Sequence, residues 1–357
     1  MDKAVAAAST ALDDDPLRLL EPGWMRLGAG RGSPMQQYIW TSSFAETFQE
    51  AGAVRIIAAG PPGSPTALAP LVQRPGPFGA LEALGVRQLF EPMDVLSADP
   101  EALSALALAI AGQGRALVLP RIPADSALIP ALRAAYRGRG YLRVVPTDGY
   151  PYIPLDRSWQ EPMAKFNAGR RSDFRRAWRH AEKLGLPSLE VLTPSPLELP
   201  ALLDEAWAVE AAGWKGERGS ALARDALRGS FFRRYARAAC GQGVLRLAFM
   251  RINGRPVAMQ VAAETANRLW LLKIGLDEAF ARCSPGQQLM MHVVSHAAQR
   301  GLDSVEFLGQ AETWTELWTR TMRPCASLRA YPFELAGLAR LAADSMAYLG
   351  RRLANAI

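Results

Sequence analysis

The sequence predicts an α/β protein built from two domains. Its 357 residues exceed what one hydrophobic core usually serves, so two domains of ordinary size are expected. Strand-like and helical segments alternate through the first half. In the second half the order is helix, helix, three-strand meander, helix, strand. Because a helix separates the last two strands, those two must lie parallel in a mixed sheet.

The first domain is expected over residues 21–150, after a mobile, Ala-rich and then acidic tail at residues 1–20. Gly and Pro residues between positions 60 and 65 mark a turn between its first two strands. No sequence repeat links the two halves, so a tandem arrangement rests on element order. The expected helices are residues 41–50, 100–112 and 126–136, and the expected strands are residues 55–59, 67–73 and 116–119.

The second domain is expected over residues 151–334. Asn253-Gly254 is a strong hairpin signal and joins the first two strands of the meander. Phe174, Trp178 and Ala181 fall on one face of a long helix that Gly185 stops. The expected helices are residues 163–184, 199–210 and 285–300, and the expected strands are residues 152–155, 244–251, 255–263, 268–276 and 304–308.

The bulk composition restricts the partners and the compartment. Lys and Arg exceed Asp and Glu by seven, which favours an anionic partner such as CoA, a phospholipid surface, a nucleotide-linked substrate or RNA. Three cysteines, Cys240, Cys283 and Cys325, form no CxxC pair or disulfide framework and favour a reducing compartment. The first twenty residues lack the pattern of a signal peptide. The most apolar stretch of the sequence has only half the length that a helix needs to cross a bilayer. We expect a cytoplasmic protein that at most rests peripherally on the inner face of a membrane.

The segment from Ser284 to Gln288 is the first candidate site. Ser284 is a preferred N-cap and Pro285 suits the first helical turn, so a helix begins sharply at the end of a strand. Its free N–H groups and positive dipole end suit an anion such as a pyrophosphate, and Gly286 permits close approach. An ordinary capped helix explains the same residues.

Glu210 is the second candidate. Leu203, Trp207 and Glu210 share one helical stripe, so the carboxylate lies on the inward face. Lost hydration should raise its pKa, as a general base near neutral pH requires. The alternative is a helix-end glutamate that bends out to solvent. The glycine-punctuated loop that follows carries Trp214 and Lys215, and such a loop either closes over a substrate or is a plain turn.

Further charged residues have both functional and structural explanations. Asp277 and Glu306 can face a gap between diverging strands, or can be a strand-end turn and an edge residue. Arg171, Arg175 and Arg179 form a ridge that suits phosphates or a solvated face, with Arg170, Arg176 and Lys183 beside it. His292 and His296 share a helix face without a third ligand, so they are interpreted as structural and no metal is expected. No nucleophile elbow, Walker loop or Rossmann fingerprint is present.

Taken together, five segments resemble the BioF2-like, or CelD-type, acetyltransferases of the GNAT superfamily, which are related to the FemAB aminoacyltransferases. The segments are "RRSDFRRAWRHAEKLG", "EAAGWKGERGS" followed by "FFRRYA", "RINGRPVAMQ", "LDEAFARCSPGQQL" and "EFLGQAETWTELW". The resemblance implies two tandem GNAT-like α/β domains with mixed sheets flanked by helices, and an acyl-CoA site in the second. One departure is that Thr315 follows Trp314, where the family usually has a lysine.

The resemblance also implies a reaction. Acyl-CoA is the donor and co-substrate, with no permanently bound cofactor, and a primary amine is the acceptor. The thioester lies between the strands at residues 268–276 and 304–308, and the pyrophosphate lies on residues 284–288. Trp214, Lys215, Arg171, Arg175 and Trp314 are expected to bind substrate. Glu210 is the first choice of base, followed by Glu306 and Asp277.

The acceptor and the rival functions remain hypotheses. An amino sugar for envelope or exopolysaccharide synthesis is one candidate, and a long-chain amino alcohol that yields a ceramide-like lipid is another. Residues 335–357 carry an apolar stripe beside basic residues, as an interfacial helix or a packed terminal helix would. The preferred interpretation has no nucleic-acid partner. The alternatives are FemAB-like transfer from aminoacyl-tRNA, and a degenerate binding module in polysaccharide synthesis.

Overall fold

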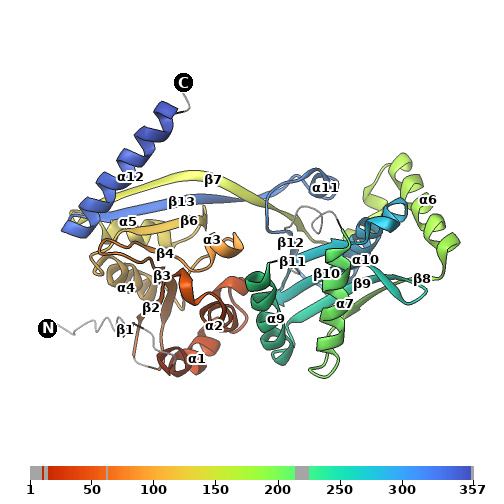
Figure 1. The fold of residues 1–357 in the computed structure, drawn as a ribbon, viewed down its shortest axis with the longest axis horizontal. Coiled ribbons are helices and arrows are strands. Elements are labelled where there is room, and N and C mark those ends of the chain that lie inside the picture. Colours follow the sequence, from red (N-terminus) through yellow and green to blue (C-terminus); the bar gives the residue numbers. More distant parts are fainter. Residues whose placement is uncertain (1–9, 12–14, 62, 214–224, 355–357) are drawn as a thin grey trace. The chain divides into compact units, whose positions relative to one another are not determined.

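A computed structural model describes residues 10–11, 15–61, 63–213 and 225–354 of the chain (Figure 1). The chain divides into two compact units. The first unit comprises Met1–Tyr150 with Met322–Ile357, and the second comprises Pro151–Thr321. The expected boundary at residue 150 coincides with this division. Residues 322–334, expected in the second domain, lie instead with the first unit.

The first unit is a mixed sheet flanked by helices. Its strands follow the order β1-β2-β3-β4-β6-β13-β7, in which β4 pairs with β6 in parallel and the other printed pairs are antiparallel. The strands are β1 (Thr10–Ala11), β2 (Ala53–Ala59), β3 (Ala67–Gln73), β4 (Leu81–Ala83), β5 (Leu96–Ser97), β6 (Leu117–Pro123), β7 (Gly140–Pro154) and β13 (Met322–Pro332). The helices are α1 (Asp15–Gly28), α2 (Tyr38–Thr47), α3 (Val86–Leu89), α4 (Pro100–Ala111), α5 (Leu128–Ala135) and α12 (Leu335–Ala354).

The second unit has the same architecture, with strand order β7-β12-β11-β10-β9-β8. The last residues of β7 belong to this unit and pair with β12. Its helices are α6 (Ala168–Leu184), α7 (Leu199–Ala211), α9 (Ala226–Gly241), α10 (Pro285–Gln299) and α11 (Thr313–Glu316). The strands are β8 (Pro187–Leu192), β9 (Leu245–Ile252), β10 (Arg255–Thr265), β11 (Arg268–Leu276) and β12 (Ser304–Glu306), and the 3-10 turns are η3 (Arg157–Gln160), η4 (Pro162–Lys165) and η5 (Glu278–Cys283). The mixed α/β fold class is therefore confirmed.

Turn chemistry sets the register of the meander in the second unit. Asn253 and Gly254 both have positive φ, at 49° and 77°, as a two-residue hairpin between β9 and β10 requires. Ala266 and Asn267 make the next hairpin, also at positive φ. Apolar residues that alternate along β9 and β10 then face a core shared with the buried face of α10.

The strands β11 and β12 separate after a short parallel contact. Only residues 268–270 of β11 pair with residues 304–306 of β12. Beyond that point Leu308 and Gly309 both adopt positive φ, at 56° and 54°, and the chain turns away. The rest of β11, up to Leu276, therefore extends past the end of β12. We call this separation the splay. Because of it, β12 ends at Glu306, whereas the sequence predicted a strand over residues 304–308.

Several other elements differ from the sequence expectation. Helix α1 begins at Asp15, inside the range expected to be a tail. The long helix begins at Ala168 rather than at residue 163, because Pro162 starts a separate 3-10 turn and Asn167 caps α6. Strand β7 is far longer than the expected residues 152–155. Strands β8 and β13 and helix α9 were not predicted.

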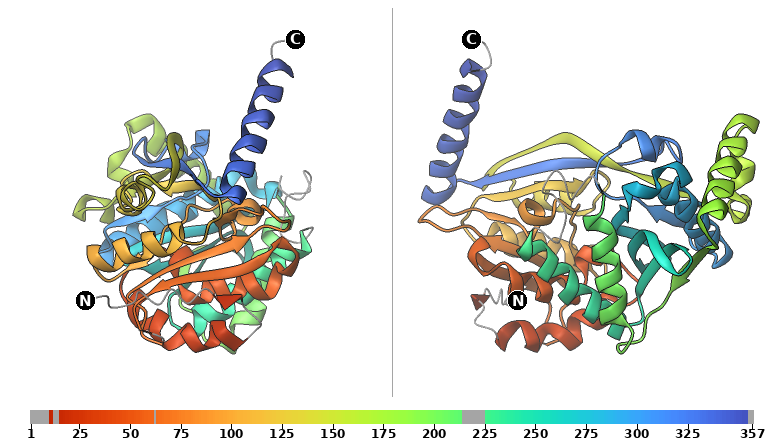
Figure 2. Two further views of the ribbon diagram at one scale, coloured as in Figure 1. Left: turned by 90° about the vertical axis from the view of Figure 1, so that its left-hand side faces the viewer. Right: turned by 45° about the vertical axis from the view of Figure 1, so that its right-hand side comes forward.

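Helix α12 leaves the end of β13 and extends away from the sheet of its own unit (Figures 1 and 2). Its first half is attached, because Leu341 packs on Ala80 and Tyr331, and Asp344 accepts hydrogen bonds from Arg329 and Tyr331. Its second half exposes Met346 and Leu349. No helix among the described residues is long and apolar enough to cross a membrane.

Candidate active site

The end of β11 is packed unusually closely by helix α7. A Cβ atom on Gly275 would lie 2.9 Å from the Cα of Glu210, and a Cβ on Gly213 would lie 2.6 Å from the carbonyl oxygen of Leu276. Side chains at both glycines are therefore excluded, and the last turn of α7 rests directly on the splayed part of β11. This contact places Glu210 beside the strand end.

Glu210 is buried, as the helical stripe predicts. Its exposed fraction is 2 %, against 4 % for Leu203 and 6 % for Trp207 on the same stripe. The alternative in which the carboxylate bends out to solvent is excluded. Glu210 is therefore a buried carboxylate beside a splayed strand end.

Helix α10 begins next to the same strand end. Ser284 precedes it with φ 47° and ψ 50°, a left-handed conformation that is uncommon outside glycine, asparagine and aspartate. Its side chain makes no capping hydrogen bond to the helix. A Cβ on Gly286 would lie 3.3 Å from Leu276, so strand end and helix start are in close contact.

The amide donors at this helix start are fewer than expected. Pro285 has no N–H group, and the amides of Gln287 and Gln288 already donate to the carbonyl oxygen of Ser284, at 3.0 and 3.1 Å. The amide of Gly286 is the remaining first-turn donor. The sequence predicted several free N–H groups at this helix start. The structure instead offers an anion one amide donor and the positive end of the helix dipole.

The side chains of Gln287 and Gln288 hold α10 in place. Gln287 accepts a hydrogen bond from the indole of Trp318 at 2.7 Å. Gln288 is buried and donates to the carbonyl oxygen of Phe174 in α6 at 2.8 Å. Pro285 is also buried. Of the five residues expected to bind cofactor, Ser284 and Gly286 are the ones whose position suits direct contact with a ligand.

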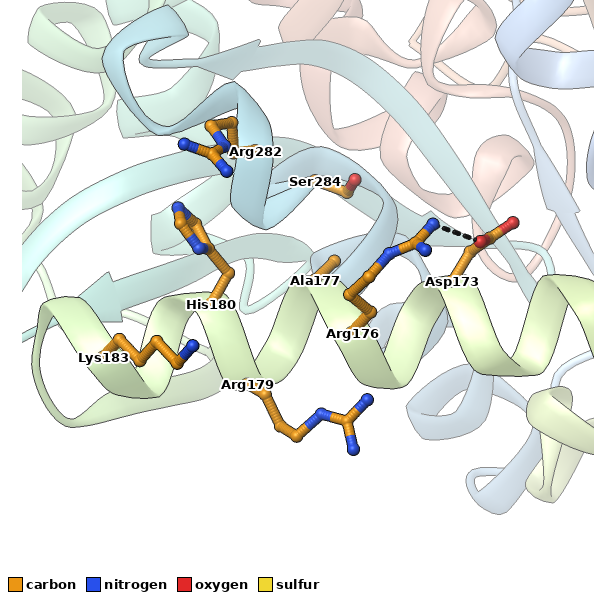
Figure 3. A pocket seen from close by; sticks show the side chains of 8 residues that line it. All are labelled: Asp173, Arg176, Ala177, Arg179, His180, Lys183, Arg282 and Ser284. Atoms are coloured by element: carbon orange, nitrogen blue, oxygen red, sulfur yellow. Dashed lines mark hydrogen bonds and ion pairs between the residues drawn. The ribbon is translucent and has the colours of Figure 1, made fainter.

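A cationic cavity of about 630 Å³ opens at Ser284, between α6 and η5 (Figure 3). Figure 3 shows His180 rising from α6 toward Arg282 and Ser284, whereas Arg179 turns the other way. We call this cavity the basic pocket. Arg176 forms an ion pair with Asp173 at 2.6 Å, in which both side chains are well exposed. The lining residues are Asp173, Arg176, Ala177, Arg179, His180, Lys183, Arg282 and Ser284.

The basic pocket is lined by His180 and Arg282, which the sequence analysis did not select, and by Arg176 and Lys183, which it placed beside the arginine ridge. Phe174, Ala177 and Ala181 form the buried face of α6, so Arg176, His180 and Lys183 face the pocket. The expected ridge is split: Arg171 donates to the carbonyl oxygen of Phe166 at 3.1 Å, and Arg175 lines a different cavity. Arg179 lies between the two cavities and borders both. Arg282 could have been selected from the sequence, because it lies two residues before the predicted helix cap Ser284.

The other two carboxylates have structural partners. Asp277 accepts from the amide of Ala279 at 3.0 Å, which caps η5, and pairs with Arg255 at 2.6 Å. Glu306 is fully buried and accepts from the hydroxyl of Ser304 at 2.6 Å, at the paired end of β12. These contacts favour the strand-end interpretation for Asp277, and they show that Glu306 is an interior residue, not an edge residue.

The remaining predicted residues lie elsewhere or outside the described part of the chain. Trp214 and Lys215 fall in residues 214–224, which are not described. The indole of Trp314 donates to Glu312 at 2.9 Å, and its ring meets that of Phe307 at 5.5 Å. Burial lowers the pKa values of His292 and His296. Within the described residues no cluster of three His, Cys, Asp or Glu side chains suits a metal ion.

Comparison with known proteins agrees with this geometry. Residues 168–316, from α6 to α11, match the family model for an acetyltransferase (GNAT) domain. No curated protein shows a significant match to the sequence. The BioF2-like or CelD-type subfamily in particular is not resolved by these matches.

Three solved structures share the fold over nearly the whole chain. A C-terminal domain described as that of a lysylphosphatidylglycerol synthetase from Agrobacterium fabrum has a TM-score of 0.55 and 14 % identity, covering 92 % of this chain and 96 % of its own. FemX has a TM-score of 0.55 and 14 % identity, covering 91 % and 97 %. A protein of unknown function from Bacteroides thetaiotaomicron has a TM-score of 0.54 and 10 % identity, covering 91 % and 99 %.

The matched segment contains the basic pocket, the splay of β11 and β12, and Glu210. It spans most of the second unit and none of the first. Residues 168–316 of the second unit thus match a GNAT-type acetyltransferase domain, and this match supports an acyltransferase.

Proposed function

We propose that this protein transfers an acyl group from an acyl-CoA thioester to a primary amine of an envelope or lipid precursor. The observation that carries the proposal is the coincidence of three features at the end of β11. The strand splays from β12, Glu210 lies buried beside it, and the basic pocket opens at the adjoining start of α10.

The basic pocket suits the phosphates of CoA. Arg176, Lys183 and Arg282 supply cations around Ser284, and guanidinium groups bind phosphate oxygens through paired hydrogen bonds. The amide of Gly286 and the positive end of α10 add a further favourable field. We assign the phosphates of the co-substrate to this pocket and its thioester to the splay.

The chemistry then needs one proton acceptor. The amine must be neutral to attack the thioester carbonyl, and Glu210 receives its proton, directly or through a water molecule. The new C–N bond forms as the C–S bond breaks. The CoA thiolate leaves and takes up a proton, which gives an amide and free CoA. Glu306 is a less suitable base because it lies at the paired end of β12 rather than at the splay. Asp277 is less suitable because it caps η5.

A membrane-borne acceptor, such as a long-chain amino alcohol, fits better than an amino sugar in solution. Met346 and Leu349 on α12 are 67 % and 58 % exposed, and Leu338 is 47 % exposed. An exposed apolar helix surface on a protein with net positive charge suits the surface of an anionic membrane. The fold shared with FemX and with a domain described as a lysylphosphatidylglycerol synthetase supports an envelope precursor as acceptor.

Membrane contact is tested by vesicle co-sedimentation. The Met346→Glu, Leu349→Glu double variant should lose binding to anionic vesicles, because charge is placed on the exposed surface of α12. Leu197→Glu is the matched control, since Leu197 is 93 % exposed and lies in the second unit. Equal sedimentation of all three proteins would remove the membrane part of the proposal.

The reaction itself is tested by measuring free thiol from a panel of acyl-CoAs and amines. Thiol release that requires both substrates supports the proposal. The basic surface of α6 also suits RNA, so transfer from an aminoacyl-tRNA is the rival reaction, and it yields no free CoA. A protein that binds CoA but releases no thiol with any amine would instead be a binding module.

A further inference from the structure

A second cavity lies on the opposite flank of α6 from the basic pocket. Its volume is about 590 Å³, and we call it the helix groove. One stripe of α6 and one stripe of α10 form its walls, and the turn at residues 160–163 closes one end. The lining residues are Gln160, Glu161, Pro162, Met163, Phe174, Arg175, Trp178, Arg179, Glu182, Leu189, Gln288, Met291, His292, Ser295 and Gln299.

The body of the helix groove is apolar. Trp178, Leu189 and Met291 are only partly buried, and they pack on the core from the groove side. Phe174 contributes a fully packed wall, with an exposed fraction of 4 %. An indole opposite a polarisable thioether accommodates a flat ring or an alkyl chain equally well.

The α10 wall of the groove is polar but uncharged. Burial lowers the pKa of His292, so its imidazole is neutral at pH 7. Ser295 donates to the carbonyl oxygen of Gln160 at 2.6 Å, and the side chain of Gln299 donates to Ser295 at 3.2 Å. This wall can orient a ligand by hydrogen bonds but brings no net charge.

The α6 wall supplies the charge. The helix carries six Lys and Arg residues against two acidic residues. Arg175 and Arg179 line the groove directly. Glu182 lies one turn from Arg179 and offsets part of its charge, and Glu161 lies on the closing turn. Because the field of α6 as a whole is positive, an anionic group is favoured beside Arg175.

We propose that the helix groove is a second ligand site, which binds an amphipathic organic anion such as a carboxylate on an alkyl chain or aromatic ring. The apolar part lies between Trp178 and Met291, and the anionic group meets Arg175. Helix α10 separates the groove from the sheet, since Leu289, Met290 and Val293 face the core. The groove is therefore distinct from the splay, and its assignment does not depend on the reaction proposed above.

The site also adjoins the bond that positions the start of α10. Gln288 lines the groove, and its amide donates to Phe174 on the opposite wall at 2.8 Å. A ligand in the groove would touch this link between α6 and α10. The basic pocket is lined by α6 and by Ser284, the residue that precedes α10. A ligand bound in the groove is thus expected to change the affinity for CoA. By thermodynamic linkage, bound CoA then changes the affinity for the groove ligand by the same factor.

Fluorescence titration with 8-anilinonaphthalene-1-sulfonate tests the site, because this probe joins an aromatic body to an anion. Wild-type protein should bind it saturably. Arg175→Gln should weaken binding about tenfold through loss of a charge-assisted contact, without disturbing the fold, since Arg175 is exposed. Trp178→Ala should remove saturable binding. Octanoate should displace the probe, and octylammonium should not.

Two control variants locate the probe. Arg176→Gln alters the basic pocket on the other flank of α6, and Met346→Glu with Leu349→Glu alters the exposed surface of α12. Neither should change probe affinity. The proposal is overturned if either control lowers affinity as Arg175→Gln does, if Arg175→Gln has no effect, or if octylammonium competes as well as octanoate.

Discussion

The two units of this protein share an element order but differ at the start of the helix that follows the three antiparallel strands. In each unit helices precede three antiparallel strands, which are followed by a helix and a strand that runs parallel to the third strand. In the first unit that helix is α4, and Asp99 caps it by accepting from the amide of Ala102 at 2.7 Å. In the second unit the helix is α10, with Ser284 at positive φ and no side-chain cap.

The two helix starts therefore differ in the charge that they present to an anion. A carboxylate at the start of α4 neutralises the positive end of the helix and occupies an amide that an anion would need. The start of α10 has no such acid and has Arg282 nearby. The first unit has thus the features of a stable scaffold, and the second those of a binding domain.

Buried carboxylates differ between the units in the same way. Glu82 in β4 is held by two hydrogen bonds from Arg87, at 2.5 and 2.6 Å. Glu210 instead lies against the splayed end of β11, where Gly275 makes room for it. The first arrangement holds a carboxylate in an ion pair, and the second places a buried carboxylate against a splayed strand end.

The largest expected effect is that of Glu210→Gln. Loss of the proton acceptor should lower kcat by about 10²–10⁴-fold, with little change in the Kd for CoA. Thiol release and calorimetry measure the two quantities. Glu82→Gln is the matched control in the first unit and should leave kcat unchanged in the folded protein. If Glu82→Gln lowers kcat as much, the contrast between the two carboxylates is wrong.

The next effect concerns a partly buried acid of the first unit. Burial raises the pKa of Asp94 to about 6. A carboxyl whose folded-state pKa exceeds its unfolded value binds its proton more tightly when folded, so this group contributes less stability as pH rises from about 4 to 6. Asp94→Asn should therefore gain stability relative to wild type over that window, by up to about 3 kcal/mol.

Chemical unfolding at a series of pH values measures this change. The difference between Asp94→Asn and wild type should level off above pH 6. A difference that is constant from pH 4 to pH 8 would show that the carboxyl titrates normally in the folded protein. The hydrogen bond from the Ser126 hydroxyl at 2.9 Å, which lowers the pKa, would then outweigh burial.

A smaller effect is expected from Gly275→Ala. The added methyl group would lie 2.9 Å from the backbone of Glu210, so α7 must move away from β11. Overpacking of this kind costs about 1–3 kcal/mol of stability, and displacement of Glu210 should also lower kcat. Gly286→Ala, which meets only a flexible leucine at 3.3 Å, is the milder control. Equal melting temperatures and rates in both variants would contradict the close approach of α7.

The smallest effect is expected from exchanging the residues that precede α10 and α4, Ser284 and Asp99. Ser284→Asp should raise the Kd for CoA about tenfold, because a carboxylate then faces the phosphates, and aspartate tolerates the left-handed conformation. Asp99→Ser should leave CoA affinity unchanged and cost at most a few tenths of a kcal/mol, because serine also caps helices. Binding calorimetry on both variants decides whether α10 receives the phosphates.

Sequence patterns predicted the strands of the meander better than the site. β3 and β11 match their expected bounds, because apolar stretches are delimited there by glycine, proline and asparagine turns. The inward orientation of Glu210 was predicted correctly, because Glu210 shares one helical stripe with Leu203 and Trp207. The sequence did not predict which surface of α6 faces the basic pocket, because it placed Trp178 on the buried face of the helix, where the structure has Ala177. That rotation moves the relevant cations from Arg171 and Arg175 to Arg176 and Lys183.

The missed elements had no local signal. β13 depends on its pairing with β6, which lies some two hundred residues earlier in the chain, and such a partner is invisible in a short window. The splay depends on the positive φ values of Leu308 and Gly309, and leucine gives no hint of that conformation. Close approach at Gly213 and Gly275 likewise requires knowledge of what packs against them.

The position of β13 determines when each half of the protein can mature. It lies between β6 and β7 in the sheet of the first unit, yet it is translated after the whole of Pro151–Thr321. The sheet of the first unit can therefore be completed only after the whole of the second unit has been translated. Expression of residues 1–150 alone leaves interior strand edges uncovered, and aggregation of that fragment is the expected result.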